Sequence, residues 1–289
     1  MALRDWSPFP RPRPVGREPG PVLAAALADL DRLIASRPEL AGAGRSLAVV
    51  LRAAFLTPAR AAPPHADPEV LTAAWRAGVP AFRAGDSPPA LDQADLRARM
   101  VAILEGLSAE NTQALSLLDA IRSGRVEPHA WAVAVLADRA DEVDAAALGL
   151  DPLLVRSVLR MALLPVLARH SEALAPLRPD GLWTRGDCPH CGGPPTLAES
   201  RGLEQRRYWR CGLCAADWEG ERLRCPYCGE SDHRRLSYLF VEGEQERYRL
   251  SLCSSCDGRL KVVATLGPLS APALLVVELA TIHLDMAQS

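Results

Sequence analysis

Cysteine is absent from the first 180 residues, although the chain of 289 residues contains eight cysteines. This absence excludes disulfides and thiolate metal sites from more than half of the protein. Lysine is nearly absent too, since Lys261 is the only lysine among 33 basic residues, which we attribute to genome composition. The formal net charge is only −2, so the overall charge does not indicate a polyanionic partner.

The chain also lacks a run of about 18 apolar residues, the length that a membrane span needs. The segment "APALLVVELATIHL" is too short and carries Glu278. The start, "MALRDWSPFPRPRPV", has no apolar centre of the kind found in secretory signals. We therefore expect a cytoplasmic protein without membrane insertion. In that compartment, paired cysteines more often bind metal or perform redox chemistry than form structural disulfides.

The first half of the chain, residues 1–180, has the pattern of a helical domain. Its apolar residues recur at helical spacing in three stripes. These stripes are Leu23, Leu27, Leu30 and Ile34; Leu47, Val50, Leu51, Ala54 and Phe55; and Leu96, Met100, Ile103, Leu104 and Leu107. The pattern predicts an all-α bundle of six to eight helices with proline-rich connectors at 57–68 and 85–89. His65, His129 and His170 have no spaced partner, so we interpret them as surface or capping residues.

Helix boundaries are marked in the same half. Asp151 at a cap position and Pro152 in the first turn predict the start of a helix, and Gly124 ends an earlier one. Pro165 is expected to kink or split the helix that follows Asp151.

The second half, residues 181–289, changes character. Short β-prone runs, "RRYWR", "RRLSYLFVE", "ERYRLSL" and "RLKVVA", alternate with Gly, Pro and Cys elements, and "APALLVVELATIHLDMAQ" predicts a closing helix. The expected fold class is α plus small β. A helical bundle precedes two rubredoxin-like or zinc-ribbon-like four-cysteine modules and a C-terminal helix.

The cysteines form four CxxC pairs, and two such pairs can supply the four corners of one tetrahedral metal site. The pairs are Cys188/Cys191, Cys211/Cys214, Cys225/Cys228 and Cys253/Cys256. Gly192 and Gly229 follow the second cysteine of two pairs, where a positive φ turns backbone amides towards sulfur. The eight cysteines are therefore predicted to ligate two metal ions, iron or zinc, because four thiolates suit both.

Two of these pairs, "CPHC" and "CPYC", also look like thioredoxin-type redox signatures. A redox pair needs a helix that begins within it to lower the thiol pKa, and neither surrounding sequence supplies one. We therefore favour metal binding over dithiol catalysis. His190 and Tyr227, which make the redox resemblance, are then incidental. As possible ligands, His190 and His233 are interpreted as supporting or exposed residues. With every ligand position filled, we expect no catalytic residue.

The grouping of the pairs has two alternatives. Sequential pairing places the first and second pairs on one ion, whereas cross-bracing places the first and third together. A hairpin expected between Cys228 and Cys253 favours the sequential grouping. A nucleic-acid-binding ribbon is a weaker alternative, since residues 180–261 carry thirteen basic and thirteen acidic residues.

The cysteine-rich half resembles the accessory proteins for assembly of respiratory formate dehydrogenases. The resemblance rests on "CPHCGGPP", "RYWRCGLCAADWEGERLRCPYCG", "LCSSCDGRLK" and "ELATIHLD". It implies a non-catalytic cytoplasmic factor that binds the molybdenum- or tungsten-containing catalytic subunit, with iron in the CxxC sites. Tyr208, Trp218 and Arg222 become candidate partner contacts, although packing on a metal knuckle is the preferred role for Trp218. The identity of the client and formation of a homodimer stay open. An electron-transfer or thiol-redox protein is the alternative function.

Overall fold

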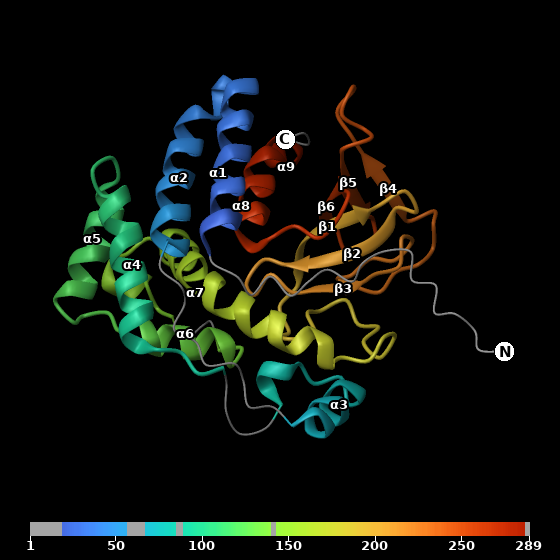
Figure 1. Ribbon diagram of the computed structural model, residues 1–289, viewed down its shortest axis with the longest axis horizontal. Helices are drawn as coiled ribbons and strands as arrows, with labels where there is room; N and C mark the ends of the chain where they lie inside the picture. The colour runs from blue at the N-terminus through green and yellow to red at the C-terminus, as the bar shows by residue number, and fades with distance from the viewer. Residues whose placement is uncertain (1–18, 57–66, 85–88, 140–142, 287–289) are drawn as a thin grey trace.

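The computed structural model describes residues 19–56, 67–84, 89–139 and 143–286. Helices gather on one side of the molecule and a single β-sheet on the other (Figure 1). The expected fold class is confirmed: a helical region precedes a sheet that carries two four-cysteine groups, and helices close the chain. His65 and much of the two proline-rich connectors lie outside the described residues.

Seven α-helices precede residue 181 in the described part of the chain, within the predicted range. They are α1 (Pro19–Ser36), α2 (Ala41–Phe55), α3 (Pro68–Arg76), α4 (Gln93–Leu107), α5 (Thr112–Arg122), α6 (Pro128–Leu136) and α7 (Pro152–Leu174). Side chains of Asp67, Asp92, Asn111 and Asp151 accept hydrogen bonds from backbone amides in the first turns of α3, α4, α5 and α7. These caps satisfy amides that a helix start leaves without partners.

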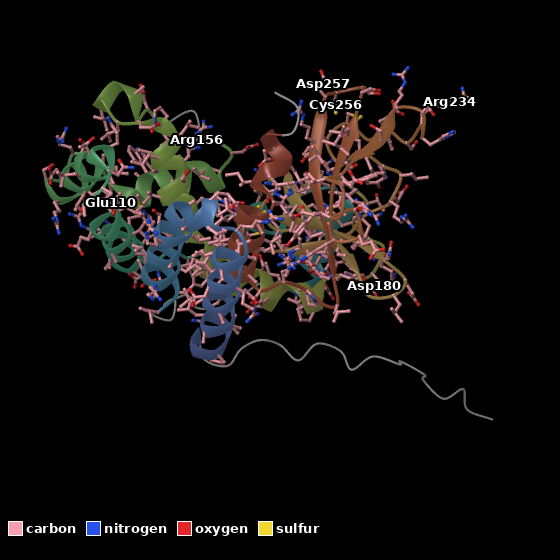
Figure 2. All side chains as sticks on the ribbon, turned by 90° about the horizontal axis from the view of Figure 1, so that it is seen from above. Glu110, Arg156, Asp180, Arg234, Cys256 and Asp257 are labelled. Carbon is pink, nitrogen blue, oxygen red and sulfur yellow. The ribbon has the colours of Figure 1, made fainter. Side chains whose placement is uncertain are left out.

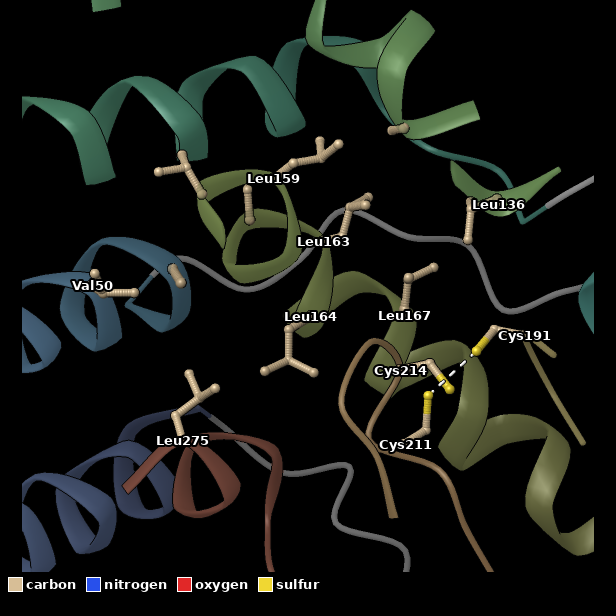
Figure 3. Close-up of a cluster of buried hydrophobic side chains, with 14 of the residues drawn as sticks. Val50, Leu136, Leu159, Leu163, Leu164, Leu167, Cys191, Cys211, Cys214 and Leu275 are labelled. Carbon is tan, nitrogen blue, oxygen red and sulfur yellow. Dashed lines mark hydrogen bonds between the residues drawn. The ribbon is translucent and has the colours of Figure 1, made fainter. Parts of the chain in front are cut away.

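Helix α7 lies at the centre of the helical half and is buried along most of its length. Leu163 and Leu167 are fully buried among residues from several other elements (Figure 3). Pro165 was expected to kink or split this helix, and a split is wrong because α7 runs uninterrupted from Pro152 to Leu174. Packing on all sides holds the helix together where the proline removes one backbone hydrogen bond.

The sheet has six strands in the order β3-β2-β1-β6-β5-β4. The strands are β1 (Pro195–Arg201), β2 (Arg206–Cys211), β3 (Asp217–Glu219), β4 (Leu236–Leu239), β5 (Tyr248–Cys253) and β6 (Gly258–Thr265). Each half of the sheet is an antiparallel meander of three consecutive strands. The predicted runs correspond to β2, β4, β5 and β6, whereas β1 and β3 were not predicted.

The two meanders join through parallel pairing of β1 and β6, with Leu197 opposite Lys261 and Arg201 opposite Thr265. The sequence indicated two separate small modules, and the structure unites them in one sheet. Strand β1 was not predicted, because its sequence "PTLAESR" contains Pro, Ala, Glu and Ser, which have low β-propensity. Pairing on both sides stabilises it instead.

The closing helix divides into α8 (Ala271–Ala280) and α9 (Ile282–Met286). Helix α8 packs on α1, α2 and α7 and thus lies against the helical half (Figure 1). One buried core also continues from the helices to Trp209, Ala198 and Leu260 of the sheet. The division into domains 1–180 and 181–289 stays a prediction.

None of the described helices combines the length and the apolar character that a membrane span needs.

His170 on α7 is only 1% exposed, so its interpretation as a surface or capping residue is wrong. Burial is the main cause that lowers the pKa of His170, and the charge of Arg169 lowers it further, so the ring is neutral. The Phe82 ring lies edge-on to it, with 6.3 Å between the ring centroids.

Candidate metal centres

The eight cysteines come together in two groups of four. Site 1 consists of Cys188, Cys191, Cys211 and Cys214, and site 2 consists of Cys225, Cys228, Cys253 and Cys256. Within each site the Sγ atoms all lie within 4.8 Å of one another. This is the sequential grouping that the predicted hairpin favoured.

The sulfur positions fit a tetrahedral metal ion. Four sulfur atoms about 2.3 Å from a metal are separated by about 3.8 Å. In site 1, the Cys188–Cys214 and Cys191–Cys211 Sγ distances are 3.5 and 3.3 Å. In site 2, the Cys225–Cys256 and Cys228–Cys253 distances are 3.6 and 3.7 Å. Each site could hold one ion through four thiolates, as four-cysteine centres of zinc or iron require.

Each CxxC pair lies on a tight backbone turn, which we call a knuckle. The amide of Gly192 donates to the Cys188 carbonyl at 2.9 Å, and the Cys188 amide donates back to the Gly193 carbonyl at 2.8 Å. The amides of His190 and Gly193 point at the sulfurs of Cys188 and Cys191, each at 3.4 Å. Such N–H···S contacts orient thiolates and stabilise their charge.

The residue after the second cysteine has a positive φ in all four pairs. The values are 80° at Gly192, 56° at Ala215, 78° at Gly229 and 55° at Asp257. The two glycines were predicted for this role. Ala215 and Asp257 were not predicted to have a positive φ, because among residue types glycine is the usual sign of a left-handed backbone. Their spacing from the preceding cysteine, equal to that of the glycines, was the available signal.

Site 1 lies between the sheet and the helical half. Trp75 of α3 donates its indole N–H to the Pro189 carbonyl at 2.9 Å, and the Ala81 amide donates to the same oxygen at 2.9 Å. The Phe82 amide donates to the His190 carbonyl at 2.8 Å. Backbone of the first knuckle is therefore hydrogen-bonded to residues more than 100 positions earlier in the chain.

The second knuckle of site 1 is held from α7. Arg160 donates through Nε to the Gly212 carbonyl at 2.7 Å and pairs with Glu278 of α8 at 2.5 Å. Cys191, Cys211 and Cys214 converge beside Leu167 of α7 (Figure 3). Site 1 thus forms part of the main hydrophobic core.

Sequence reasoning led to two interpretations of His190, as an incidental residue and as a supporting or exposed one. The structure shows that His190 is neither incidental nor exposed. The ring is 1% exposed and lies 6.5 Å from Trp75 and 6.3 Å from Phe82 between ring centroids. Burial lowers the His190 pKa to about 3, so the ring is neutral at neutral pH. It fills the contact between site 1 and α3.

Tyr227 is likewise more than incidental. Its hydroxyl donates to either of two nearby carbonyls, Pro195 at 3.1 Å and Arg259 at 2.9 Å, which ties the knuckle of site 2 to β1. Burial raises the pKa of Tyr227 to about 12, so the hydroxyl keeps its proton. The Pro226 carbonyl also lies against Gly186, where an added Cβ would come within 1.8 Å of the oxygen.

A buried ionic cluster that sequence reasoning missed lies in the first meander, on β1, β2 and β3. Glu199 of β1 is 0% exposed and pairs with Arg201 at 2.9 Å and Arg210 at 2.8 Å. Arg201 also reaches Asp217 at 2.5 Å. Burial opposes ionisation of Asp217, but the charges of Arg201 and Arg210 outweigh it and lower the Asp217 pKa. Arg210 and Asp217 lie on other strands than Glu199, so no local sequence pattern marks the cluster.

The three predicted partner-contact residues have different surroundings. Trp218 is 1% exposed, donates its indole N–H to the Arg185 carbonyl at 3.2 Å and packs edge-on against Trp209. These contacts are of the packing type that was preferred for it. Tyr208 is half-buried below the Arg201 guanidinium at 4.2 Å, and Arg222 is exposed. Their contact with a partner stays a prediction.

Comparison with known proteins finds relatives that are similar to this chain over part of its length. No family model matches the chain. An FdhE homologue from Stutzerimonas stutzeri is 37% identical over 103 residues, 34% of this chain and 32% of that protein. A homologue from Pseudomonas aeruginosa is 39% identical over 107 residues, 34% of each chain, and one from Pseudomonas putida is 30% identical over 172 residues, 55% of this chain and 50% of that one. The chain thus matches about a third of the length of the first two relatives.

The structural similarity extends further. The crystal structure of the FdhE protein from Pseudomonas aeruginosa superposes with a TM-score of 0.61 and 27% identity, covering 92% of this chain and 89% of that one. The shared fold therefore includes the helical half, where sequence motifs were lacking. These similarities confirm the resemblance drawn from the cysteine motifs: the chain is similar to FdhE proteins in the sequence around its cysteines and in its fold.

Proposed function

We propose that this protein is a cytoplasmic accessory factor that binds the catalytic subunit of a molybdenum- or tungsten-containing formate dehydrogenase and supports its assembly or activation. One observation carries the proposal. Eight cysteines form two groups of four, each able to hold one ion, on a fold shared with an FdhE protein. The name of that relative suggests the client.

The proposed role is non-catalytic. Catalytic metal sites keep one coordination position open for water or substrate, whereas structural sites fill all four positions with protein ligands. Sites 1 and 2 each provide four cysteines, so an ion held by them has a complete set of thiolates. We propose iron as the native ion, as the family resemblance implies, with zinc as the alternative. Bound there, the ion would cross-link two knuckles in each module.

The client-binding surface is proposed to include Tyr208 and Arg222. Arg222 is exposed just before the third cysteine pair, and its carbonyl accepts a hydrogen bond from the Tyr238 hydroxyl at 3.2 Å. This contact positions the Arg222 backbone while its guanidinium faces solvent. An exposed arginine on a fixed backbone suits recognition of a carboxylate or another polar group of the client.

The decisive experiment is affinity purification of the tagged protein from anaerobic cell extract, followed by mass spectrometry and metal analysis. We expect the catalytic subunit of a formate dehydrogenase to co-purify with a protein that contains two ions per chain. A strain that lacks the gene should lose formate dehydrogenase activity, and the purified protein should turn over no formate itself.

Matched variants sharpen the purification. Arg222→Ala should recover less client than the unaltered protein, while Arg234→Ala, also exposed on the sheet half, serves as the control. Normal formate dehydrogenase activity in the deletion strain would refute the assembly role. Recovery of nucleic acid in place of a client, sensitive to salt, would favour a ribbon-type binding protein.

A further inference from the structure

We infer that the two four-cysteine sites have different roles towards metal: site 2 releases and takes up its ion independently, while site 1 retains its ion as part of the core. The inference rests on the proposed metal sites and not on the identity of the client. Its basis is a contrast in burial, anchoring and surroundings between two sites of identical ligand chemistry.

Burial differs first. All four cysteines of site 1 are buried, with exposed fractions of 4% or less. In site 2, Cys225 and Cys253 are buried, but Cys228 and Cys256 are exposed. Cys256 and Asp257 lie at the outer rim of the sheet half (Figure 2). A dissolved ligand can therefore approach site 2 from the side of Cys228 and Cys256, whereas residues of the core enclose site 1.

Anchoring differs as well. Site 1 knuckles accept hydrogen bonds from Trp75, Phe82 and Arg160, which belong to the helical half. Opening site 1 would break contacts that span the molecule. Local opening has a free energy that rises with the number of buried contacts it disrupts.

The outer knuckle of site 2 is held by its own meander. The Ser254 amide donates to the Arg235 carbonyl at 2.9 Å, and the Ser255 hydroxyl donates to Glu230 at 2.6 Å. The Arg235 Nε atom lies 3.8 Å from the Glu230 carboxylate, and both residues belong to the segment before β4. The 254–257 turn is exposed throughout, so it can move without disturbing the helices.

Exchange at site 2 requires only ligand substitution. The sulfur of Cys228 or Cys256 leaves the ion as a thiolate, and a donor atom of the incoming ligand takes its position. An incoming thiol would lose its proton on binding, whereas a neutral imidazole would bind through its unprotonated nitrogen. The released thiolate would take up a proton, from the incoming thiol or from water. The oxidation state of the ion does not change. The ligands that fit this step are soft donors, thiolate or imidazole, on a small chelator or on an acceptor protein.

The test is metal release from the full-length protein loaded with two zinc ions per chain. The protein is mixed with excess 4-(2-pyridylazo)resorcinol, and the zinc complex is followed by absorbance. We expect one ion to leave in a fast phase and the second at least about 100-fold more slowly, because its release needs opening of the core. The Cys228→Ser/Cys256→Ser double variant should lack the fast phase and retain the slow one.

Thiol labelling tests the same inference without a variant. Alkylation with N-ethylmaleimide during chelation, read by peptide mass spectrometry, should label the cysteines of site 2 before those of site 1. Release of both ions at one rate, or labelling of site 1 first, would overturn the inference. Binding of fewer than two ions by the unaltered protein would instead refute the proposed metal sites and with them this inference.

Discussion

The indole N–H of Trp75 donates to the carbonyl of Pro189 at 2.9 Å, across 114 positions of sequence. Pro189 lies between the first two cysteines of site 1, and Trp75 lies in the last turn of α3, in the helical half of the molecule. The bond therefore makes the geometry of a metal knuckle depend on helical packing. It also gives α3 a fixed place, since this helix has few other neighbours in the helical half.

Trp75→Phe should lower the free energy of unfolding by about 1 to 2 kcal/mol, through loss of one buried hydrogen bond and part of a buried ring. The carbonyl of Pro189 keeps the Ala81 amide as a donor, which limits the loss. Urea unfolding of the metal-loaded protein measures the change. Trp131→Phe, at a half-buried position of α6, is the control and should cost less. Equal losses would show that the Trp75 hydrogen bond contributes little.

Glu199→Gln should destabilise the protein by about 3 to 5 kcal/mol, because it removes the fully buried carboxylate that pairs with two guanidinium groups and leaves Asp217 as their remaining anion. Arg201 and Arg210 are both mostly buried around this carboxylate. The matched control is Glu219→Gln, whose side chain is 60% exposed in its pair with Arg206. That change should cost no more than about 1 kcal/mol. Chemical denaturation at neutral pH compares the two variants, and similar values would contradict the structural role of the cluster.

Gly186→Ala should separate the two modules locally. An added Cβ would lie 1.8 Å from the Pro226 carbonyl oxygen, and both groups belong to backbone that cannot rotate away. We expect a loss of about 2 to 3 kcal/mol, measured by thermal or urea unfolding. Gly267→Ala is the control, since nothing lies within 4 Å of its added Cβ, and it should change stability by less than about 0.5 kcal/mol. A neutral Gly186→Ala variant would disprove the close contact.

Gly192→Ala and Gly229→Ala form a second matched pair. Both glycines have a φ near 80°, so alanine at either position should cost about 1 to 2 kcal/mol in backbone strain. At Gly192 the added Cβ would also come within 3.0 Å of Pro80 and 3.1 Å of Arg83, whereas at Gly229 the nearest atom is 3.9 Å away. Unfolding of the metal-loaded variants should therefore show a larger loss for Gly192→Ala. The reverse order would mean that Pro80 and Arg83 move without cost.

Local sequence signals predicted much of this structure. The apolar stripes, the Asp151 cap and the four β-prone runs correspond to observed elements, because helix periodicity and capping depend on residues a few positions apart. Strands β1 and β3 were not predictable in this way. Their residues have little β-propensity, and pairing with β2 and β6 stabilises them. Pro165 did not split α7 for a similar reason, since packing around this helix outweighed a local helix breaker.

For the candidate metal centres, the CxxC spacing predicted eight ligating cysteines, because ligands two residues apart share a turn. The spacing left two groupings open, and the hairpin expected between Cys228 and Cys253 favoured the grouping that the structure has. The spacing carried no information about burial. Only the tertiary structure distinguishes a core site held by Trp75 and Arg160 from a surface site with Cys228 and Cys256 exposed. The contacts that create this difference join residues far apart in the chain, and their free energy depends on how the two halves pack together.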